Sequence, residues 1–158
     1  MDIIVVGGTK QQRALVEQAA AFYSNFLIGS VSDLFITIKL KRNLLNKEDV
    51  KADCLLDEDE DDYKSFEIRI DSLMNMPGVL RSLAHEMVHV SQYYSGKMKD
   101  RGISGVVWKG QAMSLTIAHY YDLPWEVEAY SMEEGLYERF VTRKKLGRAK
   151  WYRDRDYL

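Results

Sequence analysis

Two of the three histidines in this 158-residue chain stand four positions apart, and a glutamate directly follows the first: "HEMVH", residues 85–89. On an α-helix, side chains at positions i and i+4 lie on one face, so the imidazoles of His85 and His89 can converge on one metal ion. Glu86 lies on the same arc of the helix, about 60° from His89 at ~100° per residue. The pattern predicts a Zn²⁺ site in which Glu86 takes a proton from a water molecule that the zinc activates.

Such a site needs a helix over residues 77–95. Asn75 is a typical helix cap, Pro77 is tolerated in a first turn, and Gly96 is typical of a helix end. Glu86 points nearly along the apolar stripe of this helix and is expected to be buried, where an unpaired carboxylate costs several kcal/mol. A metal site accounts for Glu86 and both histidines together. The alternative is a pair of core histidines with ordinary hydrogen-bond partners. The apolar stripe consists of Val79, Leu83, Met87, Val90 and Tyr94.

A catalytic zinc ion also needs a third protein ligand, and the last long helix supplies the candidates. This helix is expected to start near Leu123-Pro124, with Asp122 as its cap, and to run to about Lys145. Its apolar stripe consists of Trp125, Ala129, Met132, Leu136 and Phe140.

Measured from Trp125, Glu128 lies about 60° to one side of this stripe and Glu126 about 100° to the other. Glu128 is therefore the preferred third ligand and Glu126 the alternative. His119 lies just before the helix. It could be the ligand instead, or it could act in catalysis by steadying the oxyanion, a role also open to Tyr120 or Tyr121.

The remaining elements predict an α+β fold in one domain, residues 1–158. Apolar spacing of three and four indicates an amphipathic helix over residues 9–27. Alternation or β-rich composition indicates strands at 2–7, 33–41, 50–56 and 65–70, and a hairpin at 105–114 that turns at Lys109-Gly110.

Two charged segments each have a structural interpretation and a functional one. The acidic run Asp57–Asp62 is interpreted as a solvated hairpin tip; as a calcium loop it would lack the central Gly and terminal Glu of an EF-hand. The basic tail, about residues 143–158, is interpreted as a helix end docked by its aromatics, Trp151 and Tyr152. The alternative is a patch that binds a DNA or RNA backbone, which Asp154 and Asp156 weaken.

Bulk properties favour a soluble cytoplasmic protein with no membrane partner. The net charge of −2 gives no general attraction to nucleic acid or anionic membrane, and the lone Cys54 excludes an internal disulfide framework. The N-terminal apolar run is too short for a signal peptide, and no stretch is long enough to span a bilayer.

"HEMVHVSQYY" followed by "YYDLPWEVEAY" resembles a group of phage-encoded metallopeptidases with H-E-x-x-H and a later P-W-E-x-E-A. More broadly, the chain is similar to small zincins of the SprT-like and minigluzincin type. The resemblance implies a helix, a three-stranded sheet, the H-E-x-x-H helix, a hairpin and a C-terminal helix. It also implies His85 and His89 as zinc ligands, Glu86 as general base, and a third ligand from Pro124–Ala129, with Glu128 matching the E-A pair.

SprT-like proteases often use a third histidine, for which this chain shows no clear equivalent. In related proteases, extended peptides pair with a sheet edge, and "SFEIRI" (65–70) is the expected edge strand here.

The predicted function is that of a zinc metalloendopeptidase acting on proteins or peptides, in the host cytoplasm if the chain is phage-encoded. The alternative is a non-catalytic, zinc-binding zincin-like protein that serves as a structural or binding module, for example in a phage particle. Retention of Glu86 favours catalysis, because a purely structural site needs the ligands but not the base. A DNA-associated protease is a third option that only the basic tail supports.

Overall fold

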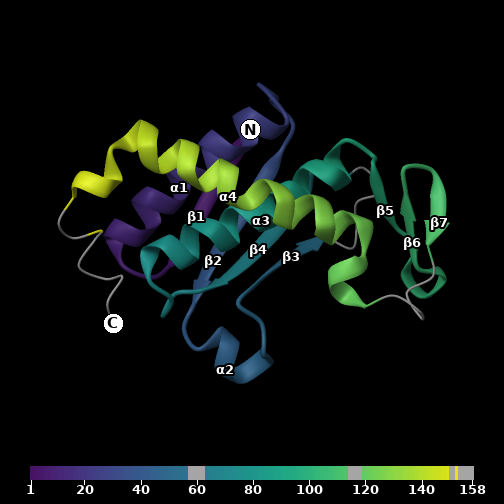
Figure 1. Cartoon of the computed structure of the whole chain (residues 1–158), viewed down its shortest axis with the longest axis horizontal. Helices are drawn as coiled ribbons and strands as arrows, with labels where there is room; N and C mark the ends of the chain where they lie inside the picture. The colour runs from purple at the N-terminus through teal and green to yellow at the C-terminus, as the bar shows by residue number, and fades with distance from the viewer. Residues whose placement is uncertain (57–62, 114–118, 150–151, 153–158) are drawn as a thin grey trace.

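The computed structural model describes residues 1–56, 63–113, 119–149 and 152. The first half contains β1 (Asp2–Gly7), α1 (Lys10–Leu27), β2 (Phe35–Lys41), α2 (Leu44–Glu48), β3 (Ala52–Leu56) and β4 (Ser65–Asp71). The second half contains α3 (Met76–Tyr94), β5 (Met98–Asp100), η1 (Gly102–Ser104), β6 (Val106–Trp108), β7 (Gln111–Met113), η2 (Tyr120–Asp122), α4 (Pro124–Lys144) and η3 (Leu146–Arg148). Together they form a small α+β structure (Figure 1).

The three long helices, α1, α3 and α4, form a layer on one face of a four-stranded mixed sheet (Figure 1). The strand order is β1-β2-β4-β3, with β1, β2 and β4 parallel and β3 antiparallel to β4. Alternation along the two inner strands buries one row of side chains against the helices and leaves the other face more polar, where Lys39 and Glu67 form an ion pair of 2.7 Å. The buried row consists of Ile36, Ile38, Leu40, Phe66, Ile68 and Ile70.

Helix α3 lies in the middle of the helical layer. It packs against α1, α4 and the strands β3 and β4, and every residue from Leu83 to Val90 is buried. Its polar side chains in this stretch therefore have to be compensated inside the protein. The small sheet β5–β6–β7 lies at one end of the molecule, beyond the C-terminal end of α3 (Figure 1).

Most of the predicted elements are confirmed within a residue or two. Asn75 caps α3, since its side chain accepts a hydrogen bond from the Gly78 amide at 2.8 Å, and Gly96 follows the helix with φ of 70°. The hairpin turns at Lys109-Gly110, where both φ angles are positive, as a two-residue type I′ turn requires. Strand β5 pairs with β6 and adds a third strand that was not predicted.

Three predictions about the fold are wrong. The main sheet has four strands and not three, because β1 pairs in parallel with β2 across α1. "SFEIRI" forms β4, which lies between β2 and β3 and is not an edge strand; an alternating pattern fixes which face is buried but not the neighbours. Asp122 does not cap α4, because the cap position is Leu123 and has no side-chain hydrogen bond.

The two charged segments fall largely outside the described residues. This applies to the acidic run Asp57–Asp62 and, in the tail, to Trp151, Asp154 and Asp156. Tyr152 is buried in the main core, and its hydroxyl lies 2.6 Å from that of Tyr137, which agrees with a tail docked by an aromatic side chain. In the described residues, no helix has the length and apolar character needed to cross a membrane.

Candidate metal centre

Helices α3 and α4 bring three potential metal ligands together in the interior. The Nε2 atoms of His85 and His89 lie 3.2 Å apart. Glu126, from the first turn of α4, places one carboxylate oxygen 3.1 Å from His85 Nε2 and the other 3.3 Å from His89 Nε2. The three side chains are buried, and one donor atom from each lies within 4.8 Å of the others. These residues could hold a metal ion.

The spacing of the donor atoms fits a tetrahedral metal ion. With metal–ligand bonds of about 2.0–2.1 Å, two ligand atoms of a tetrahedral zinc ion lie about 3.3 Å apart. His85 Nε2 lies close to this distance from both His89 Nε2, at 3.2 Å, and Glu126 Oε2, at 3.1 Å, while the other carboxylate oxygen, Oε1, lies 3.3 Å from His89 Nε2. Two imidazoles and one carboxylate form a donor set found in catalytic zinc sites, and it also suits other divalent first-row metals.

Two further side chains fix the orientation of the imidazole rings. His85 Nδ1 lies 3.0 Å from Glu133 Oε2, and His89 Nδ1 lies 2.9 Å from Gln92 Oε1. The Gln92 amide in turn donates to the Trp125 carbonyl oxygen at 3.0 Å. In a metal-loaded site each ring would be neutral and would donate Nδ1–H outward, which directs its Nε2 lone pair toward the centre of the cluster, as a metal ligand requires.

Glu126 reaches the histidines, whereas Glu128, the carboxylate preferred from the sequence, does not. The Glu128 carboxylate instead pairs with Lys97 Nζ and accepts a hydrogen bond from Gln92 Nε2 at 2.9 Å. The apolar stripe used to set the helical phase included Trp125, which packs in a separate cluster with Met98, Trp108 and Leu123.

The core-facing residues of α4 give a different helical phase. They are Ala129, Leu136, Tyr137 and Phe140. At ~100° per residue, Glu126 lies about 60° from Ala129 on the side of Tyr137, and Glu128 lies about 100° away on the other side. Without Trp125, the phase of α4 therefore points Glu126 toward α3.

The electrostatics of the cluster centre on the buried Glu126. Burial acts to raise the pKa of this carboxyl, but hydrogen bonds from His85 and His89 outweigh it and lower the pKa to about 2. Burial acts to lower the pKa of His85, but hydrogen bonds to Glu126 and Glu133 outweigh it and raise the pKa to about 9. The carboxylate is thus stabilised by positive charge at the centre of the cluster, and a divalent cation would supply the same compensation.

A cavity of about 190 Å³ opens beside the cluster, with Glu86, His89 and Glu126 in its wall. Glu86 is 6 % exposed, and its carboxylate has no hydrogen bond or ion pair with any described residue. Burial raises its pKa to about 7, although His89 and His85 act in the opposite direction. The remaining lining residues are Ala52, Asp53, Cys54, Tyr93, Met98, Tyr120 and Trp125.

Of the candidates for a role in catalysis outside α3, Tyr120 is the one in this cavity. Its hydroxyl donates a hydrogen bond to Glu126, and although the residue is 54 % exposed, desolvation of the hydroxyl and this hydrogen bond raise its pKa, so the hydroxyl keeps its proton. Tyr121 is 69 % exposed and packs on Tyr120 and Tyr130 outside the cavity wall. His119 is also exposed and is not among the lining residues.

Sequence reasoning missed the two residues that orient the rings. Glu133 stands seven positions after Glu126, two helical turns along the same face, and Gln92 stands three positions after His89. Both spacings could have indicated side chains that face the same cluster.

Comparison with known proteins gives no family assignment, since no family model, no curated protein and no solved structure matches the chain.

Replacing Glu126 and Glu128 separately by alanine tests which carboxylate is the ligand. Glu126→Ala should weaken zinc affinity about 100-fold or more, because it removes a donor from the cluster, whereas Glu128→Ala should weaken it at most about tenfold through Gln92. Competition with a zinc-chelating dye measures both. A larger loss in Glu128→Ala would contradict the assignment.

The role of Glu133 can be tested against its neighbour Glu134, which forms an exposed ion pair with Arg81. Glu133→Ala should lower zinc affinity about tenfold, because His85 loses the acceptor that orients its ring. Glu134→Ala should leave the affinity unchanged. Equal zinc affinities for the two variants in the same dye competition would show that Glu133 does not act through His85.

Proposed function

We propose that the chain is a zinc-dependent metallopeptidase that hydrolyses peptide bonds in this cavity. The observation that carries the proposal is the Glu86 carboxylate, buried beside the His85–His89–Glu126 cluster without a hydrogen bond or ion pair among the described residues. Placing a carboxylate this deep in the protein, with only the cavity to hydrate it, is costly, so a purely structural site would be expected to lack it. A general base needs this position, because its carboxylate has to be free to accept a proton.

In the proposed reaction, a bound zinc ion supplies Lewis-acid chemistry, which activates water and polarises a carbonyl group. Glu86 accepts a proton from the water that attacks the scissile carbonyl carbon. It then donates this proton to the nitrogen of the leaving amine as the C–N bond breaks. Its pKa, raised to about 7 by burial, lies in the range where a carboxyl group can both accept and return a proton.

Tyr120 is the proposed hydrogen-bond donor to the substrate carbonyl oxygen as negative charge develops there. Its hydroxyl lies in the cavity wall and is protonated; its one proton, donated to Glu126 in this structure, would turn to the substrate oxygen in the reaction. A donor held in place before the reaction stabilises the developing oxyanion with little reorganisation. This assigns to Tyr120 the role that the sequence left open among His119, Tyr120 and Tyr121.

Strand β3 is the proposed binding edge for an extended peptide, in place of "SFEIRI". Only one side of β3 pairs with a strand, β4, in the described part of the chain. Ala52, Asp53 and Cys54 of this strand line the cavity, so a peptide added to the free edge would place its backbone next to Glu86.

A non-catalytic role is the second candidate, and the placement of the ligands favours it. His85 and His89 come from α3 and Glu126 from α4, so a metal ion would cross-link the two helices and stabilise the fold. This role requires the three ligands but does not explain why Glu86 is buried beside them.

Glu86→Gln separates the two functions, because glutamine has nearly the same size but cannot accept the proton. The variant should bind zinc and unfold at the same temperature as the original protein, while peptide cleavage falls at least about 100-fold. Undiminished cleavage of a peptide library would remove Glu86 from the mechanism. If the original protein cleaves no peptide and zinc only raises its Tm, the cross-linking role is the better account.

Tyr120→Phe and Tyr121→Phe form a matched pair of neighbouring tyrosines. Loss of the Tyr120 hydroxyl should lower kcat about 10- to 100-fold with little change in KM, because the hydrogen bond is made in the transition state. Tyr121→Phe should leave both constants unchanged. The opposite result in steady-state kinetics would restore Tyr121 as the oxyanion donor.

A further inference from the structure

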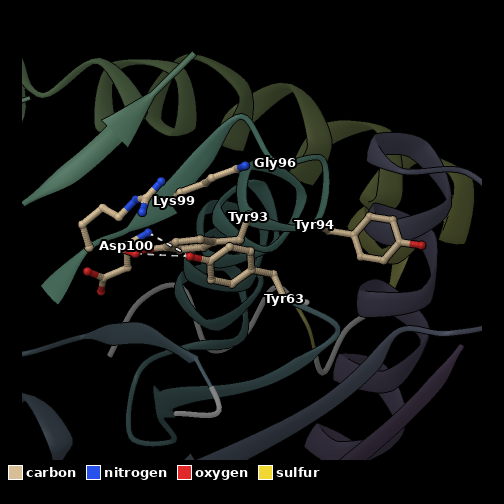
Figure 2. A pocket seen from close by; sticks show the side chains of 7 residues that line it. Tyr63, Tyr93, Tyr94, Gly96, Lys99 and Asp100 are labelled. Carbon is tan, nitrogen blue, oxygen red and sulfur yellow. Dashed lines mark hydrogen bonds between the residues drawn. The ribbon is translucent and has the colours of Figure 1, made fainter. Parts of the chain in front are cut away.

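A second pocket lies next to the proposed catalytic cavity, at the C-terminal end of α3. Its volume is about 380 Å³, and it is lined by Tyr63, Tyr93, Tyr94, Gly96, Lys99, Asp100 and Arg101. Tyr93 also lines the catalytic cavity, so the two hollows share a wall. Figure 2 shows the rings of Tyr63 and Tyr93 facing Asp100, with Tyr94 pointing away. We refer to this hollow as the basic pocket.

The tyrosine side of the basic pocket is held by contacts between segments far apart in sequence. The Tyr63 hydroxyl accepts a hydrogen bond from the Asp100 amide at 3.1 Å and donates to the Asp100 carbonyl oxygen at 3.3 Å (Figure 2). The rings of Tyr63 and Tyr93 pack with centroids 5.3 Å apart. These contacts join β5 to the start of β4 and give the pocket a defined shape.

Two side-chain cations in the pocket have no partner within the described part of the chain. The side chains of Lys99 and Arg101 form no hydrogen bond or ion pair with any described residue, unlike that of Lys97, which pairs with Glu128. Among the described lining residues, the single carboxylate, Asp100, accepts a hydrogen bond at Oδ1 from the Gly102 amide at 2.7 Å. These lining residues together carry an excess of one positive charge, which favours an anionic group.

The position of the pocket relative to the cavity fits a peptide bound along β3. Tyr93 follows His89 by one helical turn, about 6 Å along α3. Strand β3 runs from the cavity-lining Ala52–Cys54 to Leu56, which pairs with Phe66 near the ring of Tyr93. Side chains on one face of an extended peptide recur every ~7 Å, so the side chain two residues from the scissile bond would reach the pocket.

We propose that the basic pocket is a substrate subsite that binds the carboxylate of an aspartate or glutamate two residues from the scissile bond. This inference rests on the proposed peptidase function, because it places the acidic side chain relative to the scissile bond. Binding of the carboxylate itself does not depend on catalysis. The recognition would use Lys99 and Arg101 for the charge and Tyr63 and Tyr93 as the wall that excludes water.

A binding experiment tests the subsite separately from the reaction. The probes are fluorescent hexapeptides, acetylated and amidated, in which Glu or Lys takes each position in turn of an otherwise uncharged sequence. Binding to the zinc-loaded Glu86→Gln protein is measured by anisotropy. At one position, the Glu peptide should bind about fivefold or more tightly than the Lys peptide, and the difference should shrink at high salt.

Charge reversal identifies the source of this preference. Lys99→Glu combined with Arg101→Glu should abolish or invert it, and the milder Lys99→Gln with Arg101→Gln should abolish it without adding charge. Lys10→Glu combined with Arg42→Glu, at two exposed residues, makes the same change in net charge and should keep the preference.

Two outcomes would overturn the subsite: equal binding of Glu and Lys peptides at every position, or a preference that survives both double variants. If the preference is confirmed but the original protein cleaves none of the peptides, the subsite stands as a peptide-binding site and the proposed catalysis fails.

Discussion

The carboxylate of Glu126 lies in the protein interior between the two imidazoles of α3, and the rest of the site depends on this arrangement. A buried carboxylate is stable only if positive charge and hydrogen-bond donors surround it, and here His85 and His89 provide both. The contact also fixes how α4 is rotated against α3. This rotation brings Glu133 to His85 and turns Glu128 away toward Lys97.

The sheet and the other helices make this arrangement possible by enclosing α3. Apolar side chains of β2 and β4 cover one side of the helix layer, and α1 and α4 cover the flanks of α3. In such surroundings the effective dielectric constant is low, so each polar contact near the histidines is stronger than it would be in water. The same enclosure raises the pKa of Glu86. The Glu86 carboxylate then contacts solvent through the cavity beside β3.

The sequence was sufficient for features set by local spacing. The histidines four residues apart, the Asn75 cap and the alternating strands all follow from the geometry of one helix or strand, and the structure has them at the expected places. Features that depend on contacts between elements were predicted poorly. "SFEIRI" has the pattern of a half-buried strand, but its central position depends on β2 and β3.

The sequence preference for Glu128 over Glu126 as the third residue of the cluster differs from the structure for the same reason. Trp125 counts as apolar in any helical wheel, yet it packs with Trp108 of the small sheet and not with the main core. The phase of α4 could therefore not be read from hydrophobicity alone. Tyr120 was one of three sequence candidates, and only its contact with Glu126 distinguishes it from His119 and Tyr121.

X-ray absorption at the zinc K-edge of the zinc-loaded protein would test the central claim most directly, because it reports the atoms bound to the metal. Our account predicts one zinc ion per chain with nitrogen and oxygen ligands only, at about 2.0–2.1 Å, and with the scattering pattern of two imidazole rings. A sulfur ligand at about 2.3 Å would implicate Cys54, the only cysteine. That result, a single imidazole, or failure of the folded protein to bind zinc would contradict the His85–His89–Glu126 centre.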